Sequence, residues 1–467
     1  MNTKAKKPIR IKLVLAIVLL LVILVPAAWV LAVRLEGERP VVKLTPETSV
    51  VGASTDLVLD LADERCGLRG VRVTMTQKGK EVALAEASFP AVGLLKGGIV
   101  NSKRLEIKLQ PEAQGLADGE ALLRIAVTDH SWRNWWHGNR TLIEKTVTID
   151  TRPPSIAVVS RAHYISQGGS GLVVYRLSER CPSSGVQVGE HFFPGYPGFL
   201  AEDESLHLAF FAVAYDQDPD VRIFLRATDE AGNDAKAGFP HLVNPRRFPN
   251  DIIQISDRFL DWKMPEFEAD IGAMPGTSRL EQFLTVNREL RQSNYQTVKQ
   301  ICSQTDAVVH WEGVFSRLPR SAPKASFAEQ RDYRYAGEIV DHQVHLGADL
   351  ASVAQSPVPA ANSGRVVFGE NLGIYGKTVI IDHGFGLFSM YSHLSLIEVE
   401  KGQMVAKNDI IGRTGMTGLA GGDHLHFSMI VHDTFVNPVE WWDPVWIRNN
   451  ITSKLEDAKP VATETSG

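Results

Sequence analysis

Four polar side chains in two short stretches have the types and the spacing of a metal site. In VHLGADLAS (Val344–Ser352), His345 precedes Asp349 by four residues, and in GGDHLHFSM the histidines His424 and His426 alternate. Residues two apart on a strand point to the same face, and a histidine pair on such an apolar strand needs a polar partner or a metal ion. Two imidazoles and one carboxylate are ligands that zinc prefers, with one position left open for water.

A fifth candidate, His393 in YSHLS, lies between these stretches. Each residue alone is weak evidence, because a single histidine is usually structural and an HxxxD spacing often arises by chance. The combination in this order is much more specific. For His383 in IDHG we expect a supporting hydrogen bond, and for Tyr333 or Tyr335 we expect packing rather than oxyanion stabilisation.

The blocks around these residues carry a family resemblance. HLGAD, VIIDHGFGLFSMYSHLS, KGQMVAKNDIIGRTGMTG, GDHLHF and VNPVEWW follow one another over about 130 residues. Together they resemble the lysostaphin/LytM-type zinc metalloendopeptidases of the cell wall. The resemblance implies one zinc ion per chain bound by His345, Asp349 and His426, with His393 and His424 acting in catalysis.

The resemblance also implies a substrate, the peptide cross-links of peptidoglycan. The alternative is a non-catalytic LytM-type domain that binds the wall or activates another hydrolase, as some family members that lack metal ligands do. No ligand is missing here, which favours the enzyme. A third hypothesis is a structural or adhesion protein built on the N-terminal modules.

Glycine-punctuated strands over 306–447 predict an antiparallel β domain that would position these residues. Before it, 246–305 reads as a short helical connector, with Ser278 and Glu281 forming a capping box. This connector could cover the site, but packing on the domain is the default expectation. The polar end, 448–467, is expected to be flexible.

The region 38–245 alternates apolar and polar residues in short runs, which predicts β-sandwiches. LVLDLADERCGLRGVRV from Leu57 aligns without gaps with LVVYRLSERCPSSGVQV from Leu172. This internal repeat predicts two modules, 38–152 and 153–245, which resemble tandem bacterial immunoglobulin-like domains and could bind a protein partner. Cys66 and Cys181 would be equivalent core positions, and one disulfide or free thiols both stay open for the three cysteines.

The N-terminus predicts a membrane segment. Residues 13–33 are 21 uncharged residues after a lysine-rich start, long enough to span a bilayer. The positive-inside rule places 1–12 in the cytoplasm and the rest in the periplasm, anchored in the inner membrane by one helix. A cleaved signal peptide is the alternative.

Composition limits the remaining function classes. A net charge of −5 over 467 residues, with no basic stripe, gives no reason to expect nucleic acid binding. The predicted fold class is mainly β: a transmembrane helix, two sandwich modules, a helical connector and an antiparallel β peptidase domain.

Overall fold

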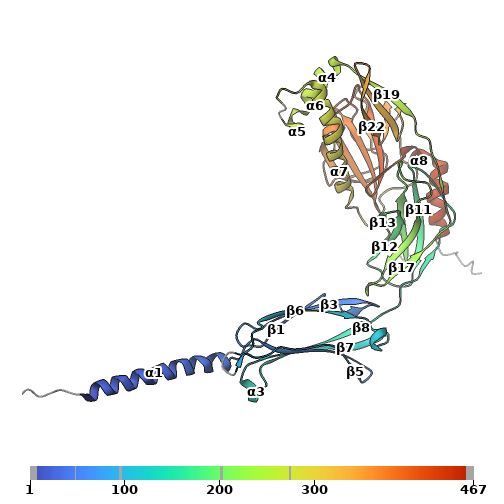
Figure 1. The fold of residues 1–467 in the computed structure, drawn as a ribbon. Helices are drawn as coiled ribbons and strands as arrows, with labels where there is room; N and C mark the ends of the chain where they lie inside the picture. Colours follow the sequence, from blue (N-terminus) through green and yellow to red (C-terminus); the bar gives the residue numbers. More distant parts are fainter. Residues whose placement is uncertain (1–7, 48, 94–96, 200–202, 273–274, 459–467) are drawn as a thin grey trace, which may run out of the picture. The chain divides into compact units, whose positions relative to one another are not determined.

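The computed structural model describes residues 8–47, 49–93, 97–199, 203–272 and 275–458, and the chain is mainly β (Figure 1). It forms two compact units. The first contains the residues up to Pro153 with Asp229–Asn233, and the second contains Pro154–Thr228 and the residues from Asp234 onward. All five candidate site residues lie in the second unit.

The first unit begins with helix α1, Pro8–Arg34. Within the described ranges it is the one helix long and apolar enough to cross a membrane, over Lys12–Arg34. Such a helix near an N-terminus fits an anchor or a signal sequence. Most of the predicted cytoplasmic segment, residues 1–7, lies outside the described residues.

Two sheets with a shared apolar core follow α1 in the first unit. Alternate residues of the central strands are buried, among them Leu57 and Leu59 in β3 and Ile125 and Val127 in β7. This is the sandwich that the period-2 alternation predicts. The strands are β1 (Val41–Thr45), β3 (Thr55–Ala62) and β6 (Ser102–Leu109) in one sheet, and β2 (Val50–Val51), β8 (Arg140–Ile149), β7 (Gly119–Asp129), β4 (Leu68–Gln77) and β5 (Lys80–Ser88) in the other. Short helices η1 (Glu112–Gln114) and α3 (Arg133–Trp136) lie in its loops.

The second unit contains another β module. It has two four-stranded sheets. The strands of the first, in order, are β14 (Tyr196–Pro197), β15 (Leu206–Ala212), β11 (Ser170–Leu177) and β9 (Ile156–Val158). The strands of the second are β13 (His191–Pro194), β12 (Ser183–Val188), β16 (Ile223–Thr228) and β17 (Asp234–Ala237). A parallel pair, β10 (His163–Ser166) and β18 (His241–Asn244), completes it. Strands β11 and β15 are buried on both faces, so this sheet is covered by more than its own partner sheet.

The internal repeat corresponds to equivalent strand pairs. The turn between β3 and β4 carries Cys66, and the turn between β11 and β12 carries Cys181. Cys66 is fully buried, whereas Cys181 is only half-buried. The expectation of equivalent core positions is therefore wrong for Cys181. None of the three cysteines, all of which lie in described residues, forms a disulfide bond.

The C-terminal domain is built on an eight-stranded sheet. Its strands are β20 (Ala322–Ala325), β23 (Ala348–Ala351), β31 (Leu425–Val431), β27 (Leu387–Leu394), β26 (Lys377–Gly384), β25 (Gly364–Asn371) and β29 (Met404–Val405), with β32 (Thr434–Val436) beside β31. The domain also has two three-stranded sheets. One consists of β24 (Pro357–Pro359), β30 (Ile410–Arg413) and β28 (Leu396–Ile397). The other consists of β19 (Asn250–Ile255), β21 (Glu329–Tyr335) and β22 (Glu338–His345). The pairs within the large sheet are antiparallel, as predicted.

The connector is a chain of short helices: α4 (Asp257–Lys263), η2 (Met264–Phe267), α5 (Glu268–Ile271), α6 (Arg279–Thr285), η3 (Val286–Leu290) and α7 (Arg291–Cys302). The predicted capping box of Ser278 and Glu281 is present at the start of α6. The connector packs on the C-terminal domain, because the buried Asn294 side chain accepts a hydrogen bond from the Ile374 N–H in η4 (Gly373–Tyr375) at 2.8 Å. Strand β19 lies within the predicted connector 246–305 and pairs in parallel with β21, so the prediction of a helical segment is wrong for Asn250–Ile255.

The described part of the chain ends with the helices α8 (Pro438–Trp442), α9 (Pro444–Ile447), η5 (Arg448–Thr452) and α10 (Ser453–Asp457). Ile451 and Lys454 are buried, and the Lys454 ammonium donates to the Leu172 carbonyl in β11 at 3.0 Å. The expectation of a flexible tail is therefore wrong for Arg448–Asp457, because this stretch covers the second module. Residues 459–467 of the predicted tail lie outside the described residues.

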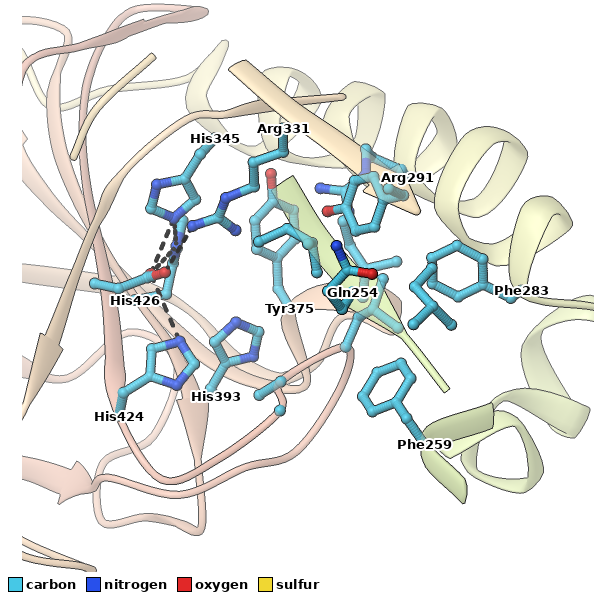
Figure 2. Close-up of a pocket in the computed structure, with 18 residues that line it drawn as sticks. Gln254, Phe259, Phe283, Arg291, Arg331, His345, Tyr375, His393, His424 and His426 are labelled. Carbon is cyan, nitrogen blue, oxygen red and sulfur yellow. Dashed lines mark hydrogen bonds and ion pairs between the residues drawn. The ribbon is translucent and has the colours of Figure 1, made fainter. Parts of the chain in front are cut away.

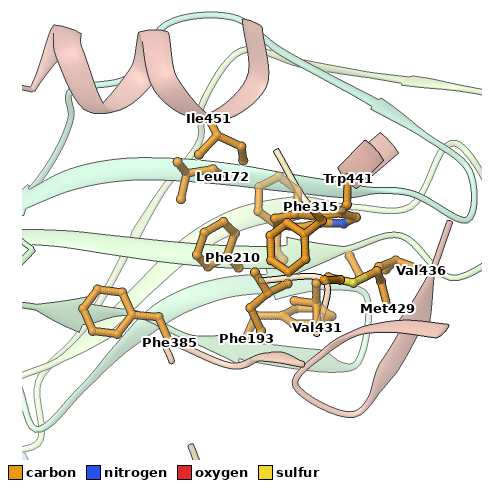
Figure 3. Close-up of a cluster of buried hydrophobic side chains, with 14 of the residues drawn as sticks. Leu172, Phe193, Phe210, Phe315, Phe385, Met429, Val431, Val436, Trp441 and Ile451 are labelled. Atoms are coloured by element: carbon orange, nitrogen blue, oxygen red, sulfur yellow. The ribbon is translucent and has the colours of Figure 1, made fainter. Parts of the chain in front are cut away.

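One apolar core joins the second module to the C-terminal domain (Figure 3). Phe210 of β15 packs against Trp441 of α8, with ring centroids 6.0 Å apart, and Phe315 packs on the same indole at 5.3 Å. Beside this contact, the buried Glu440 carboxylate accepts a hydrogen bond from the Ser170 N–H at 3.0 Å. Burial raises the pKa of Glu440 to about 7, although the hydrogen bond from Ser170 opposes the shift.

We predict that Glu440→Gln flattens the pH dependence of stability between about pH 5 and 8. The folded-state pKa lies above the ordinary value of 4.5. The wild type therefore loses up to about 3 kcal/mol as pH rises from 4.5 to about 7. Glutamine stays neutral and keeps an oxygen for Ser170. Chemical denaturation of both proteins should show similar stability at pH 5 and a more stable variant at pH 8, and a less stable variant at pH 8 would contradict the assignment.

Candidate metal centre

Strand pairing brings three of the predicted residues together. Asp349 in β23 lies directly opposite His426 in β31, and His345 is the last residue of β22. The turn between His345 and Asp349 needs a glycine, because a Cβ atom at Gly347 would come within 2.6 Å of the His426 ring. The glycine of the HLGAD block thus allows the backbone to approach the site closely.

The three side chains are buried, and their ligand atoms lie close to one another. Figure 2 shows the rings of His345 and His426 side by side. His345 Nε2 lies 2.9 Å from Asp349 Oδ1 and 2.8 Å from His426 Nδ1, and His426 Nδ1 lies 2.9 Å from the same oxygen. These atoms are close enough to share one ion. We call them the metal cluster.

The second ring nitrogen of each histidine shows which tautomer faces the cluster. His345 Nδ1 lies 2.9 Å from the Ser326 carbonyl, so it donates there and presents an unprotonated Nε2. The Ser428 hydroxyl donates to the Leu346 carbonyl at 2.8 Å and accepts from His426 Nε2 at 3.1 Å. Burial lowers the pKa of His426 to about 4, which keeps its ring neutral. Two nitrogen lone pairs and a carboxylate oxygen therefore meet with no proton between them, an arrangement that a divalent cation stabilises.

Arg331 holds the other oxygen of the aspartate. Its guanidinium lies 3.0 Å from Asp349 Oδ2 and 3.1 Å from Glu329 Oε1. The ion pair with the Arg331 guanidinium favours the ionised form of the Asp349 carboxyl group. Asp349 is therefore an anionic ligand. Arg331, Glu329 and Ser428 were not predicted, because single residues on strands carry no sequence signal of this role.

His393 and His424 lie beside the metal cluster. Their ring centroids are 4.8 Å apart, and His424 Nε2 lies 3.5 Å from Asp349 Oδ1. His393 donates through Nδ1 to the Thr417 carbonyl at 2.9 Å, and His424 through Nδ1 to the Gly422 carbonyl at 2.8 Å. With Nδ1 donating to a carbonyl, proton transfer falls to the Nε2 atom of each ring, and the Nε2 atom of His424 faces the Asp349 carboxylate. The five predicted residues thus form one constellation.

The other candidates have structural partners. His383 lies 2.7 Å from both the Ser363 carbonyl and the Ser389 hydroxyl, which is the supporting role expected of it. Tyr335 donates to the Asp257 carboxylate at 2.6 Å. Tyr333 is buried and lines the cavity beside the cluster.

That cavity has a volume of about 440 Å³ and is drawn in Figure 2. One wall carries the metal cluster with His393 and His424. The opposite wall comes from β19 and the connector, through Ile253, Gln254, Ile255, Phe259, Phe283 and Arg291. The connector therefore lines the cavity and leaves room for a ligand next to the cluster.

Comparison with known proteins identifies the region around the cluster. Residues 343–438, which include all five site residues, match the model of peptidase family M23. The chain is 40% identical over 96 residues to the peptidoglycan DD-endopeptidase ShyA of Vibrio cholerae, which is 21% of this chain and 22% of that protein. It is 36% identical over 107 residues to the DD-carboxypeptidase/endopeptidase Mpg of Neisseria meningitidis, 23% of this chain and 25% of that protein. The chain thus spans about a quarter of the length of these relatives.

A solved structure of a putative M23 peptidase from Pseudomonas aeruginosa is also similar. It is 20% identical and covers 58% of this chain and 92% of its own, with a TM-score of 0.38.

We predict that Ser428→Ala lowers metal affinity about 10- to 100-fold, because the hydroxyl fixes the tautomer of His426. The dissociation constant is measured by competition with a fluorescent chelator. Ser389→Ala, which removes another buried hydroxyl on the neighbouring strand β27, is the matched control and should bind metal as the wild type does. Equal affinity of the Ser428 variant and the wild type would refute the tautomer assignment.

Proposed function

We propose that this chain, whose C-terminal domain is an M23 peptidase domain, is a membrane-anchored zinc metalloendopeptidase that hydrolyses peptide cross-links of peptidoglycan. The observation that carries the proposal is the metal cluster, in which two imidazoles and one carboxylate converge beside a cavity. The similarity to a protein named as a peptidoglycan DD-endopeptidase supports the substrate.

The donor set fits zinc. His345, Asp349 and His426 would be its ligands, and three protein ligands leave a position for water or substrate. Zinc bound there supplies Lewis-acid chemistry, polarising a carbonyl and lowering the pKa of water. Ser326, Ser428 and Arg331 orient the three ligands through their second polar atoms.

His393 and His424 are proposed as the catalytic pair. Each is anchored through Nδ1 to a backbone carbonyl, so each Nε2 is held in a fixed direction beside Asp349. One would take a proton from the attacking water and the other would donate to the developing oxyanion. The geometry leaves the division of these two roles open.

A non-catalytic domain that binds the wall or activates another hydrolase is the alternative. The complete set of three ligands and two further histidines favours the enzyme, since neither role needs such a set. The tests below separate the two, because an activator would bind sacculi without releasing fragments by itself.

We propose that α1 anchors the protein in the inner membrane with the remainder in the periplasm. The lysine-rich start before α1 supports this orientation. The two β modules, proposed as immunoglobulin-like, would carry the peptidase domain toward the wall and offer a surface to a protein partner. A helix of this length favours an anchor over a cleaved signal peptide.

We expect His345→Ala to lose bound zinc and to release fragments from purified sacculi more than about 100-fold more slowly than the wild type. Mutation of a residue that only hydrogen-bonds to a metal ligand already lowers metal affinity or activity about 10- to 100-fold, and loss of a ligand should cost more. A chelator should have the same effect on the wild type, reversed by added zinc. Mass spectrometry of the fragments identifies the bond that is cut. Full hydrolysis by the His345 variant would exclude the proposed centre.

For His424→Ala we expect retained zinc and a kcat lowered about 10²- to 10⁴-fold, the range for loss of a general acid or base. Zinc content and steady-state rates on a cross-linked muropeptide give the two readouts. His191→Ala, an exposed histidine of the second module, should match the wild type in both. An unchanged kcat in the His424 variant would remove this residue from the proposed catalytic pair.

A further inference from the structure

Two arginines line the cavity beside the metal cluster, and their surroundings differ. The guanidinium of Arg331 bonds to the carboxylates of Glu329 and Asp349. Its charge is therefore balanced by two carboxylates. Arg331 acts by positioning Asp349.

Arg291, the first residue of α7, has no such balance. It donates through Nε to the Asn287 carbonyl at 3.1 Å and through Nη2 to the Asn287 side-chain oxygen. Across the described part of the chain, no carboxylate forms an ion pair with it. The side chain is half-buried and lies between α7 and the metal cluster (Figure 2). A partly desolvated guanidinium with unused donors is suited to a carboxylate, which it can bind through two parallel hydrogen bonds.

A second cavity of about 330 Å³ also has Arg291 in its wall. Tyr375, His345 and His426 also line both cavities. Arg291 therefore belongs to the wall that the two cavities share with the metal cluster. The far wall of the second cavity includes Ala214–Asp216 of the second β module. A peptide that crosses the cluster would pass this cation.

The position of Arg291 is prepared by a buried network. Asn287 is fully buried and donates through Nδ2 to Asp341 Oδ2 at 2.7 Å, which directs its oxygen toward Arg291. Asp341 is fixed in turn by Arg288 at 2.9 Å. The guanidinium is thus held in place before any ligand binds, which lowers the entropy lost on binding.

We propose that Arg291 is a specificity residue that binds a carboxylate of the substrate peptide next to the scissile bond. This rests on the proposed function and adds a substrate feature to it. Arg291 lies outside residues 343–438, the part that matches the peptidase family. The preference therefore belongs to the connector of this chain. The contact is made away from the reacting atoms, so its loss should raise KM more than it lowers kcat.

The test compares two matched substrates: a cross-linked muropeptide dimer with free carboxylates, and the same dimer with these carboxylates converted to primary amides. The full-length wild type should cleave the amidated dimer with a kcat/KM lower by about 10- to 100-fold, mostly through KM. Arg291→Gln should lose this factor on the free-acid dimer and cleave both substrates at similar rates. Arg291→Lys keeps the charge without the planar fork and should retain part of the preference.

Arg258→Gln is the matched control, because Arg258 is an exposed arginine of α4 that does not line the cavity. It should discriminate between the dimers as the wild type does, and zinc content should be equal in all variants. Equal cleavage of both dimers by the wild type, or wild-type discrimination by Arg291→Gln, overturns the proposal while the proposed hydrolysis stands. If the wild type cleaves neither dimer, the proposed function fails and this inference fails with it.

Discussion

The site depends on one electrostatic constraint: two nitrogen lone pairs and one carboxylate oxygen are held within 3 Å of one another away from water. The register of β23 against β31 sets this arrangement, because Asp349 pairs with His426. A slip of one residue would turn His426 to the other face of the sheet. The clustered acceptors repel one another unless a cation lies between them. The register of these strands therefore creates a binding site for a divalent ion.

The connector supports this site through two buried polar contacts. The ammonium of Lys263, fully buried in α4, donates to the Met416 carbonyl at 2.6 Å. The next carbonyl, that of Thr417, accepts from His393 at 2.9 Å. An α4 side chain thus fixes the loop that orients one of the two proposed catalytic histidines. Asn294 holds α7 against η4 in the same way. The connector is for these reasons a wall of the site and an integral part of the domain.

The sequence predicted the features that depend on local spacing. Histidines two residues apart on a strand point to the same face. A serine three residues before a glutamate forms a capping box, and this local motif does not depend on what the helix packs against. The tail was mispredicted because its order comes from β11, where Lys454 contacts Leu172, 282 residues earlier in the chain. Arg331 and Arg291 were missed for the same reason. Their roles depend on which strand or helix faces the metal cluster. That tertiary arrangement produces no periodic pattern in the sequence.

In the proposed function, the two arginines have separate roles, one in the chemistry and one in substrate recognition. Arg331 forms ion pairs with Asp349 and Glu329. It therefore positions a metal ligand, and these two carboxylates already balance its charge. The five residues proposed for the chemistry lie in the segment that matches the peptidase family. The cavity walls opposite them come from β19, the connector and the loop Ala214–Asp216 of the second module. Sites on a rigid scaffold acquire their selectivity from such added segments. Because the second module shares its core with the peptidase domain, its loop is held at a fixed place on the cleft.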